Sequence, residues 1–349
     1  MKISKPKIIK RMRKPDNNFY NYLRLNRAEF GHTFKSKRKL LDNYGYYPNI
    51  NILFNTLVKN LKIKKENLLI GLGAEGIIKD TLCYFSNNKK NFGYLAPNYF
   101  MYNIYARLYN YRLFNLNINP EKPAETNIDK LKEFIKKKKI DLFLLVNPSH
   151  PFEKNWTLSE IKELLLFCKK KNILLIIDEV YQNLGSTSAK NFIKNFTNLI
   201  VISSLSKNLG LPGLRVGYMI ASKSIIEKIE SYRLAIELPF HSIKIATDFL
   251  KDKVKINKIR KKIVDARNFA HKEFKKRHIF SFGRFGNTVT FKVKESSVAK
   301  KIGNFLKKKK ILINFNYPEP FNNFLNLTTT NTKNLKIFFS KLDLILKIK

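Results

Sequence analysis

The stretch V201-I-S-S-L-S-K-N-L-G-L-P-G-L-R-V-G-Y218 decides the fold class and the chemistry. Its one lysine, Lys207, is followed eight positions later by Arg215. Leucines and glycines surround Lys207, so we expect its side chain to be shielded from bulk water. Burial disfavours the charged form of an amine and lowers its pKa. A neutral lysine is a nucleophile toward carbonyl groups and can form a Schiff base.

The same stretch offers groups that can hold a phosphate. Ser204 and Ser206 come just before the lysine, and their hydroxyls and the Arg215 guanidinium can donate hydrogen bonds to phosphate oxygens. An amine nucleophile beside a phosphate cradle is the arrangement that pyridoxal 5′-phosphate requires. The stretch therefore predicts a site for this cofactor, with Lys207 as the catalytic residue.

Length and composition narrow the class of protein. The chain has 349 residues, 44% of them hydrophobic, which allows a large core and about two domains. No apolar run reaches the roughly 18 residues of a membrane span. The basic N-terminus lacks the apolar segment of a secretory signal. The two cysteines, Cys83 and Cys168, are too few for a disulfide framework and lack metal-ligand spacing, so we expect a cytoplasmic protein without a metal site.

The net charge of +42, from 68 Lys+Arg and 26 Asp+Glu, has two interpretations. It can mark a protein that binds nucleic acid or an anionic membrane. Alternatively, it reflects a lysine-rich composition on solvated faces, and the wide scatter of basic runs such as 169–171 and 307–310 favours this interpretation. No nucleic-acid-binding motif accompanies these runs. We therefore expect no specific nucleic-acid partner and no membrane partner, but a preference for anionic substrates.

Short apolar runs alternate with helical patterns through most of the chain. Strand-like runs cover 92–97, 140–147, 173–179, 198–203 and 216–221, helical patterns cover 49–61, 99–108 and 158–170, and a strand, glycine turn and helix cover 68–82. This alternation predicts an α/β domain with a largely parallel sheet covered by helices on both faces. Asn147, Asp178 and Ser204 stand at the ends of such runs, at the sheet edge where ligands of open α/β sheets bind.

The C-terminal part has a different pattern. We expect a long helix over roughly 223–250, and beyond about residue 260 helices mix with alternating strands such as 287–293. This mixture predicts a smaller α+β domain. The expected organisation is an N-terminal arm (1–30), a large cofactor-binding domain (31–225), and a long linking helix with the small domain (226–349).

Further motifs supply the other groups that such a site needs. Asp178 can keep a pyridinium nitrogen protonated, although the position also suits a helix N-cap. Tyr181 can donate its hydroxyl to the same ring, or it can be a core tyrosine. The glycine turn 71–76 opens a helix whose N-terminal amides can hold a phosphate. Tyr99 can stack on a flat ring, or it can pack in the core.

Together these motifs resemble one family. Their order (glycine turn, aromatic residue, polar strand end, Asp-x-x-Tyr, Ser-x-Ser-Lys with Arg) is similar to that of the fold-type I pyridoxal-phosphate aminotransferases of class I/II, and most similar to the histidinol-phosphate aminotransferase branch. S204–Y218 matches the family's lysine segment, and D178-E-V-Y181 matches its Asp-Glu-Ala-Tyr segment. The similarity runs from about residue 23 to the C-terminus. It implies a large domain with a mostly parallel, seven-stranded sheet.

The resemblance also implies roles for individual residues. Lys207 would form the Schiff base and shuttle the proton, Asp178 would pair with the pyridine nitrogen, Tyr181 would bind the 3′-oxygen, and Tyr99 would stack on the ring. Tyr47 matches a tyrosine that reaches the phosphate from the neighbouring subunit, which makes a homodimer the expected functional unit. The other phosphate ligands would be the backbone amides of Ala74 and Glu75 and the side chains of Ser204, Ser206 and Arg215.

Two parts of the sequence depart from the family pattern. The family's Asn-Pro-Thr-Gly segment corresponds to H150-P-F-E153, so His150 replaces the asparagine that binds the 3′-oxygen. A histidine can donate a similar bond and would place a titratable group by the ring, or it can be a loop residue that points elsewhere. In L325-N-L-T-T329, Asn326 replaces the arginine that clamps the substrate α-carboxylate, and Asn314 takes an upstream position that is often arginine.

A neutral amide cannot replace a guanidinium clamp. Either another arginine takes over, with Arg24, Arg27 and Arg284 as candidates, or the substrate lacks an α-carboxylate, as in a keto-sugar, an amino alcohol phosphate or a phosphonate. Arg24 and Asn326 are the candidate substrate-binding residues.

The sequence therefore predicts a pyridoxal-phosphate-dependent aminotransferase for a small-molecule amino donor and oxo acceptor, with a substrate that is phosphorylated or lacks an α-carboxylate. The first alternative is a decarboxylase or lyase of the same fold. The second is a non-catalytic cationic binding protein on this scaffold.

Overall fold

The structure is a computed structural model. It describes residues 22–26, 46–88, 90–119, 121–122, 125–152, 154–182 and 187–346. Most of the expected N-terminal arm, the candidate Arg27 and the side chain of the candidate Arg24 lie outside the described residues.

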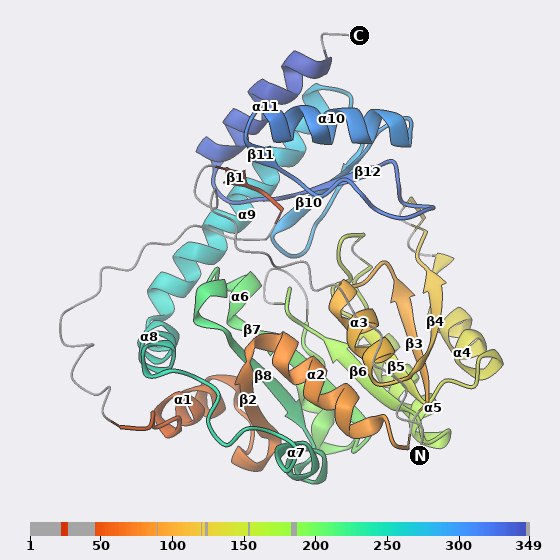
Figure 1. Ribbon diagram of the computed structural model, residues 1–349, viewed down its shortest axis with the longest axis vertical. Helices are drawn as coiled ribbons and strands as arrows, with labels where there is room; N and C mark the ends of the chain where they lie inside the picture. The colour runs from red at the N-terminus through yellow and green to blue at the C-terminus, as the bar shows by residue number, and fades with distance from the viewer. Residues whose placement is uncertain are drawn as a thin grey trace, which may run out of the picture.

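A seven-stranded sheet forms the centre of the larger part of the molecule (Figure 1). In order across the sheet, the strands are β2 (Leu68–Leu72), β8 (Val216–Ala221), β7 (Leu199–Ser204), β6 (Leu174–Asp178), β5 (Leu142–Val146), β3 (Asn91–Ala96) and β4 (Arg112–Asn117). Strands β4, β3, β5, β6 and β7 are parallel, and β8 is antiparallel to both of its neighbours. The predicted fold class, an α/β protein with a mostly parallel seven-stranded sheet, is confirmed.

Helices cover both faces of this sheet, because the central strands are apolar along their whole length. Every residue of L142-F-L-L-V146 and of L174-L-I-I-D178 is buried. One face packs against α2 (Gly73–Phe85), α3 (Phe100–Leu108) and α7 (Lys223–Glu230). The other face packs against α1 (Asn51–Leu61), α4 (Ile128–Lys137), α5 (Leu158–Lys170) and α8 (Phe240–Lys251).

The strand register places the predicted polar strand ends at one edge of the sheet. Asp178 at the end of β6 lies opposite Val146 in β5 and Ile202 in β7. Ser204 at the end of β7 lies opposite Gly217 in β8. The carboxyl ends of parallel strands are where open α/β sheets bind ligands, so this register sets the location of the candidate site.

A smaller α+β layer lies above that edge (Figure 1). Strand β10 (Thr288–Lys292) pairs antiparallel with β12 (Phe324–Thr328) and β9 (Ser281–Phe282), and α9 (Lys253–Lys276), α10 (Ser296–Lys308) and α11 (Thr332–Leu346) pack on these strands. Near the N-terminus, β1 (Leu23–Arg24) pairs parallel with β11 (Ile311–Leu312), and Leu25 is buried in the same core.

The expectation of one long helix over 223–250 is wrong. Helix α7 ends at Glu230, the segment 231–239 is not helical, and α8 begins at Phe240 after Pro239, which cannot continue a helix from the preceding turn. The long helix is α9, which starts where the Asp252 carboxylate accepts a hydrogen bond from the Lys255 amide at 2.8 Å. Its first turns pack in the core of the large sheet and its last turns in the core of the small one, so α9 joins the two.

Within the described ranges, no helix has the length and apolar character needed to cross a membrane.

Candidate active site

Lys207 lies in a single helical turn, α6 (Leu205–Asn208), at the carboxyl end of β7. The Ser204 side chain caps this turn by accepting a hydrogen bond from the Ser206 amide at 3.0 Å. The Lys207 side chain is half-buried rather than fully enclosed, so it is accessible to a small molecule. Its backbone carbonyl accepts a hydrogen bond at 3.2 Å from Asn287, which belongs to the smaller α+β layer. This bond joins the lysine turn to that layer.

Asp178 is buried on the sheet edge close to Lys207. Both of its carboxylate oxygens are held: the Val180 amide donates to Oδ1 at 3.0 Å, and the hydroxyl of fully buried Tyr102 donates to Oδ2 at 2.9 Å. Burial raises the pKa of Asp178 from 3.8 to about 6, against the opposing effect of these two hydrogen bonds and the Lys207 charge. The carboxylate is therefore oriented and poorly solvated, which favours a cationic partner such as a pyridinium nitrogen.

His150 and Tyr181 form a second side of the candidate site. Their rings stack with centroids 4.5 Å apart, and His150 Nδ1 lies 3.2 Å from the Thr288 hydroxyl of β10. Burial, reinforced by the Lys207 charge, lowers the pKa of His150 to about 3, so its imidazole is neutral at pH 7. These contacts contradict the alternative of a loop histidine that points elsewhere. A gap too narrow to hold a water molecule lies here between the large sheet and the smaller α+β layer, lined by Pro148, Ser149, His150, Tyr181, Phe285, Gly286 and Thr288.

The amino end of α2 and the start of β8 form the third side of the site. Gly73 has a φ of +69°, and its amide donates to the Arg215 carbonyl at 2.6 Å. A Cβ on Gly217 would lie 2.2 Å from the Gly73 carbonyl carbon and 2.3 Å from the Ala74 nitrogen. Only glycine allows the two segments to approach this closely, and the first amides of α2 at this point have no acceptor within the helix.

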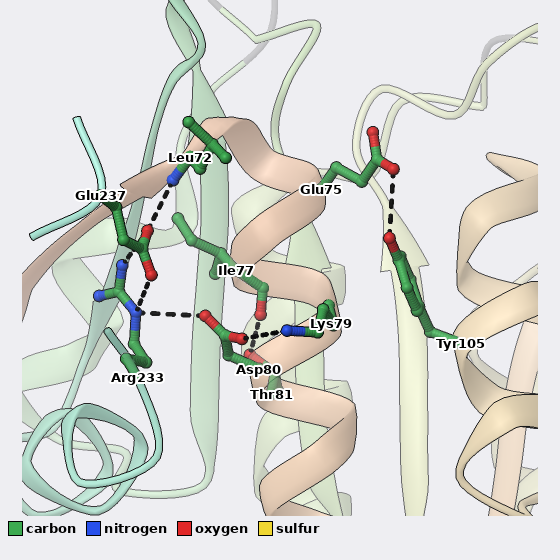
Figure 2. Close-up of polar contacts among 9 residues, drawn as sticks. All are labelled: Leu72, Glu75, Ile77, Lys79, Asp80, Thr81, Tyr105, Arg233 and Glu237. Atoms are coloured by element: carbon green, nitrogen blue, oxygen red, sulfur yellow. Dashed lines mark hydrogen bonds and ion pairs between the residues drawn. The ribbon is translucent and has the colours of Figure 1, made fainter. Parts of the chain in front are cut away.

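Charged and hydroxyl groups surround this helix end. The buried hydroxyls of Ser204 and Ser206 lie 2.8 Å apart. The Arg215 guanidinium lies 3.7 Å from the Glu75 carboxylate, which also accepts a hydrogen bond from Tyr105 at 3.2 Å (Figure 2). Two serine hydroxyls, a guanidinium and the positive end of a helix form a site suited to a dianionic phosphate.

Comparison with known proteins assigns the chain to a family. Residues 18–342 match the family described as aminotransferase class I and II. The chain belongs to the class I and II aminotransferases. This membership confirms the predicted enzyme class, a pyridoxal-phosphate-dependent aminotransferase.

The aminotransferase has relatives and structural neighbours of several names. It is 29% identical over 307 residues to the histidinol-phosphate aminotransferase of Clostridium beijerinckii, covering 86% of this chain and 82% of the relative. The histidinol-phosphate aminotransferase of Sinorhizobium meliloti, solved in complex with pyridoxal-5′-phosphate, superposes with a TM-score of 0.83 at 18% identity, covering 94% and 92% of the two chains. The L-threonine-O-3-phosphate decarboxylase of Porphyromonas gingivalis superposes with a TM-score of 0.73 at 18% identity, covering 93% and 99%.

The residues of the aminotransferase fit its family's cofactor. The buried Asp178 carboxylate and the His150 imidazole both lie close enough to the half-buried Lys207 for its charge to lower their pKa values. The close approach of Gly217 to the backbone of Gly73 and Ala74, which a Cβ would block, lies beside the serine hydroxyls. Among the residues that the structure describes, no three His, Cys, Asp or Glu side chains are placed to bind a metal ion.

Three of the expected site residues of the aminotransferase are exposed in the single chain. Tyr99, at the start of α3, is 39% exposed, and its ring packs edge-on against Phe100. Tyr47 is 86% exposed. Arg284 is exposed, and no contact with Lys207, Asp178 or His150 is found for it.

Asn326 lies buried in β12 with its amide nitrogen engaged and its Oδ1 without a hydrogen-bond partner. Its Nδ2 donates to the Thr290 hydroxyl at 2.8 Å, and that hydroxyl donates in turn to the Pro151 carbonyl at 2.8 Å. Its backbone pairs with that of Asn314. Asn326 and Thr290 therefore form a neutral link from β12 and β10 to the loop that carries His150.

Two residues near the site escaped the sequence analysis. Tyr102 comes three positions after Tyr99, which on a helix means the same face, and this spacing could have shown that it reaches the same sheet edge. Thr288, the partner of His150, lies 138 residues away in the sequence, and no local pattern connects the two.

Proposed function

We propose that this aminotransferase binds pyridoxal 5′-phosphate through Lys207 and transfers the amino group of a donor that lacks an α-carboxylate. The observation that carries the proposal is the buried Asp178 carboxylate close to Lys207. The choice of donor rests on neutral Asn326, which the resemblance aligns with the family's carboxylate-binding arginine.

The assignment of roles follows the geometry of the three sides of the site. Asp178, oriented by Tyr102 and Val180, would hold the ring nitrogen, and neutral His150 with Tyr181 would hold the 3′-oxygen. The amides of Ala74 and Glu75, the hydroxyls of Ser204 and Ser206 and the Arg215 guanidinium would hold the phosphate, and Tyr99 would cover the ring.

When bound, the cofactor supplies the electron sink that allows the Cα–H bond of a bound amine to break. The Lys207 amine then has two tasks of its own. As a nucleophile it would hold the cofactor covalently, and as a free amine it would be the base that moves the Cα proton. The smaller α+β layer contacts this side of the site through Asn287, which donates to the Lys207 carbonyl, and through Thr288, which lies against His150.

The substrate class is inferred from the residues on the His150 side of the site. None of them carries a full charge, since the pKa of His150 is lowered to about 3. An α-carboxylate held there would lack the two-pronged arginine partner that offsets its desolvation. We therefore propose an amino alcohol or amino sugar as donor. Histidinol phosphate is the first compound to test, because relatives at 25–29% identity carry its name.

A homodimer is the proposed functional unit. Tyr46 and Tyr47 are 80% and 86% exposed, which is unusual for neighbouring aromatic side chains in a monomer. The apolar side chains of Leu72, at the start of the phosphate turn, and of Phe100 are exposed as well. A second copy of the chain would cover them. Light scattering after gel filtration tests this state, and Tyr47→Ala should weaken cofactor binding only if Tyr47 reaches across the interface. A cytoplasmic location stays a proposal, which the unpaired Cys83 and Cys168 support.

The decisive experiment compares three donors that differ only at the α-substituent. Cofactor-loaded protein is mixed with histidinol phosphate, histidinol or histidine, without an acceptor, and pyridoxamine phosphate is quantified with the carbonyl product. Conversion with either histidinol compound, at least tenfold faster than with histidine, supports the proposal. Equal or faster conversion with histidine refutes the substrate class, because an α-carboxylate would then be accepted.

The same product analysis separates the alternative reaction. Release of carbon dioxide from histidine, or from threonine phosphate, without pyridoxamine phosphate would identify a decarboxylase. We favour transamination because Asn326, which the resemblance aligns with the carboxylate-binding arginine, is neutral, and a decarboxylase must bind a carboxylate.

A further inference from the structure

A buried arginine with two carboxylates lies outside the groups that have been assigned to the reaction. Arg233 belongs to the non-helical segment 231–239, and its side chain is only 7% exposed. Its Nε donates to Asp80 of α2 at 3.2 Å and to Glu237 at 3.2 Å, and its Nη2 donates to Glu237 at 2.6 Å. Figure 2 shows the three side chains converging beside the first turns of α2. We call Arg233, Asp80 and Glu237 the arginine cluster.

The arginine cluster makes hydrogen bonds to the backbone at the end of β2, on both sides of Gly71. Arg233 Nη2 donates to the Ile70 carbonyl at 2.8 Å, and the Glu237 carboxylate accepts the Leu72 amide at 2.9 Å. Gly71 itself leaves no room, because a Cβ there would lie 2.8 Å from Ile77 Cγ1 and 3.0 Å from Arg233 Nη2. The two backbone groups that precede the phosphate turn are thus fixed by side chains that lie 163 and 165 residues further along the chain.

The position of these hydrogen bonds matters because Leu72 is the N-cap residue of α2. No side chain of its own caps the helix, and the next residue, Gly73, has a positive φ. The helix start is therefore oriented from outside, by Glu237 on the Leu72 amide and by the Arg215 carbonyl on the Gly73 amide. A rotation at Leu72 would turn the amides of the first turn of α2 away from the anion that they face.

Burying the charged groups of the arginine cluster costs desolvation free energy, which makes the cluster an inefficient way to stabilise a fold. Desolvation raises the pKa of Asp80, with Arg233 opposing and the Glu237 charge adding to the rise. Apolar side chains of similar size often stabilise such a position as well as a buried ion pair does, whereas charges fix directions that apolar contacts leave loose. The geometry of this cluster thus favours an orienting role.

We propose that the arginine cluster is a positioning device for the cofactor's phosphate, in which Glu237, held by Arg233, sets the direction of the α2 amides. The inference rests on the proposed placement of the phosphate at the start of α2. Neither Arg233 nor Glu237 contacts the cofactor in this assignment, so their effect acts through the backbone of 70–73.

The test uses Glu237→Gln, which keeps the size of the side chain but loses one acceptor and the charge. The control is Glu273→Gln, because Glu273 pairs with Arg277 at 2.8 Å with the same four-residue spacing in the small domain. Affinities are measured for pyridoxal 5′-phosphate and for pyridoxal, which lacks the phosphate. Loss of a hydrogen bond to a charged group predicts that Glu237→Gln weakens the phosphate form about tenfold or more, with the pyridoxal affinity changed less than about twofold.

Hydrogen exchange of the peptide spanning 68–78 in the cofactor-free protein gives a second readout. Faster exchange there in Glu237→Gln, but not in Glu273→Gln, supports the proposal without any bound cofactor, and Asp80→Asn should give a smaller change in the same direction. Equal weakening of both ligands, or unchanged exchange and affinity, overturns it. Failure of the wild-type protein to bind either ligand would instead refute the proposed function and leave the exchange result to judge the cluster.

Discussion

Replacing Asp178 with asparagine should have opposite effects on the cofactor-free and the cofactor-bound protein. In the folded cofactor-free chain, burial raises the pKa of Asp178 from 3.8 to about 6. A carboxyl group with a raised pKa contributes its stabilisation below pH 3.8 and loses it as the pH rises through about 6. At pH 8 the ionised Asp178 therefore costs stability. At about 1.4 kcal/mol per pKa unit, the cost is about 3 kcal/mol.

Asparagine cannot ionise, and it retains the contacts that the carboxylate makes. Its oxygen can accept from the Val180 amide, and its amide group can donate to the Tyr102 hydroxyl, which accepts as well as donates. We expect cofactor-free Asp178→Asn to be about 1–3 kcal/mol more stable than wild type at pH 8 and equal to it near pH 4. Pyridoxal-phosphate affinity should fall at least a hundredfold, because a neutral amide cannot keep the ring nitrogen protonated.

Urea unfolding from pH 4 to 8, on protein stripped of cofactor, gives the stability difference, and absorbance titration gives the affinity. Glu179→Gln is the matched control. Burial raises the pKa of Glu179 to about 7, but its carboxylate accepts from Ser188 and Ala189 rather than facing the site. It should change the pH dependence of stability and leave the cofactor affinity intact. A cofactor-free Asp178→Asn protein that is no more stable than wild type at pH 8, or that binds the cofactor normally, would refute the reasoning.

Two further substitutions test the surroundings of the site. Gly217→Ala places a Cβ 2.2 Å from the Gly73 backbone and should abolish cofactor binding or folding. The control is Gly213→Ala, whose Cβ has no atom within 4 Å, and it should change neither the cofactor affinity nor the thermal unfolding temperature. A Gly217→Ala protein that folds and binds the cofactor would contradict the close packing of these two segments. Tyr102→Phe removes a hydrogen bond that lowers the pKa of Asp178, so the pH midpoint of cofactor binding should rise by about one unit. Tyr111→Phe, which loses a bond to the Leu82 carbonyl, should cost stability only, and equal midpoints in both variants would exclude the Tyr102 effect.

Much of the fold could be predicted from the sequence because its central strands are buried on both faces. Continuous apolar runs such as 142–146 and 174–178 stand out against a lysine-rich background, and polar residues mark their ends. Strand β4 escaped because it lies at the sheet edge and alternates with Asn and Arg side chains. The long helix was misplaced because helical periodicity continues on both sides of Pro239, and the contacts of Arg233 in 231–239 with Ile70 and Asp80 join residues far apart in the sequence.

The residues of the candidate site also fall into two groups, those in local sequence motifs and those brought together only by packing. Lys207, Asp178 and Tyr181 lie in short motifs with a chemical signature, so the sequence pointed to them directly. The partners that orient the site come from distant parts of the chain, as Thr288 does for His150 and Glu237 for Leu72. Their side chains are ordinary, and only the packing of the two domains and of the segment 231–239 reveals what they contact.

The most direct test of the central claim is to locate the covalent bond. Purified protein with one equivalent of pyridoxal 5′-phosphate is reduced with borohydride, digested and analysed by mass spectrometry, which separates Lys207 from the many surface lysines of a chain with a net charge of +42. We expect one phosphopyridoxyl group per chain on Lys207, and only background labelling in Lys207→Ala. Labelling spread over other lysines, or unchanged in Lys207→Ala, would contradict the account.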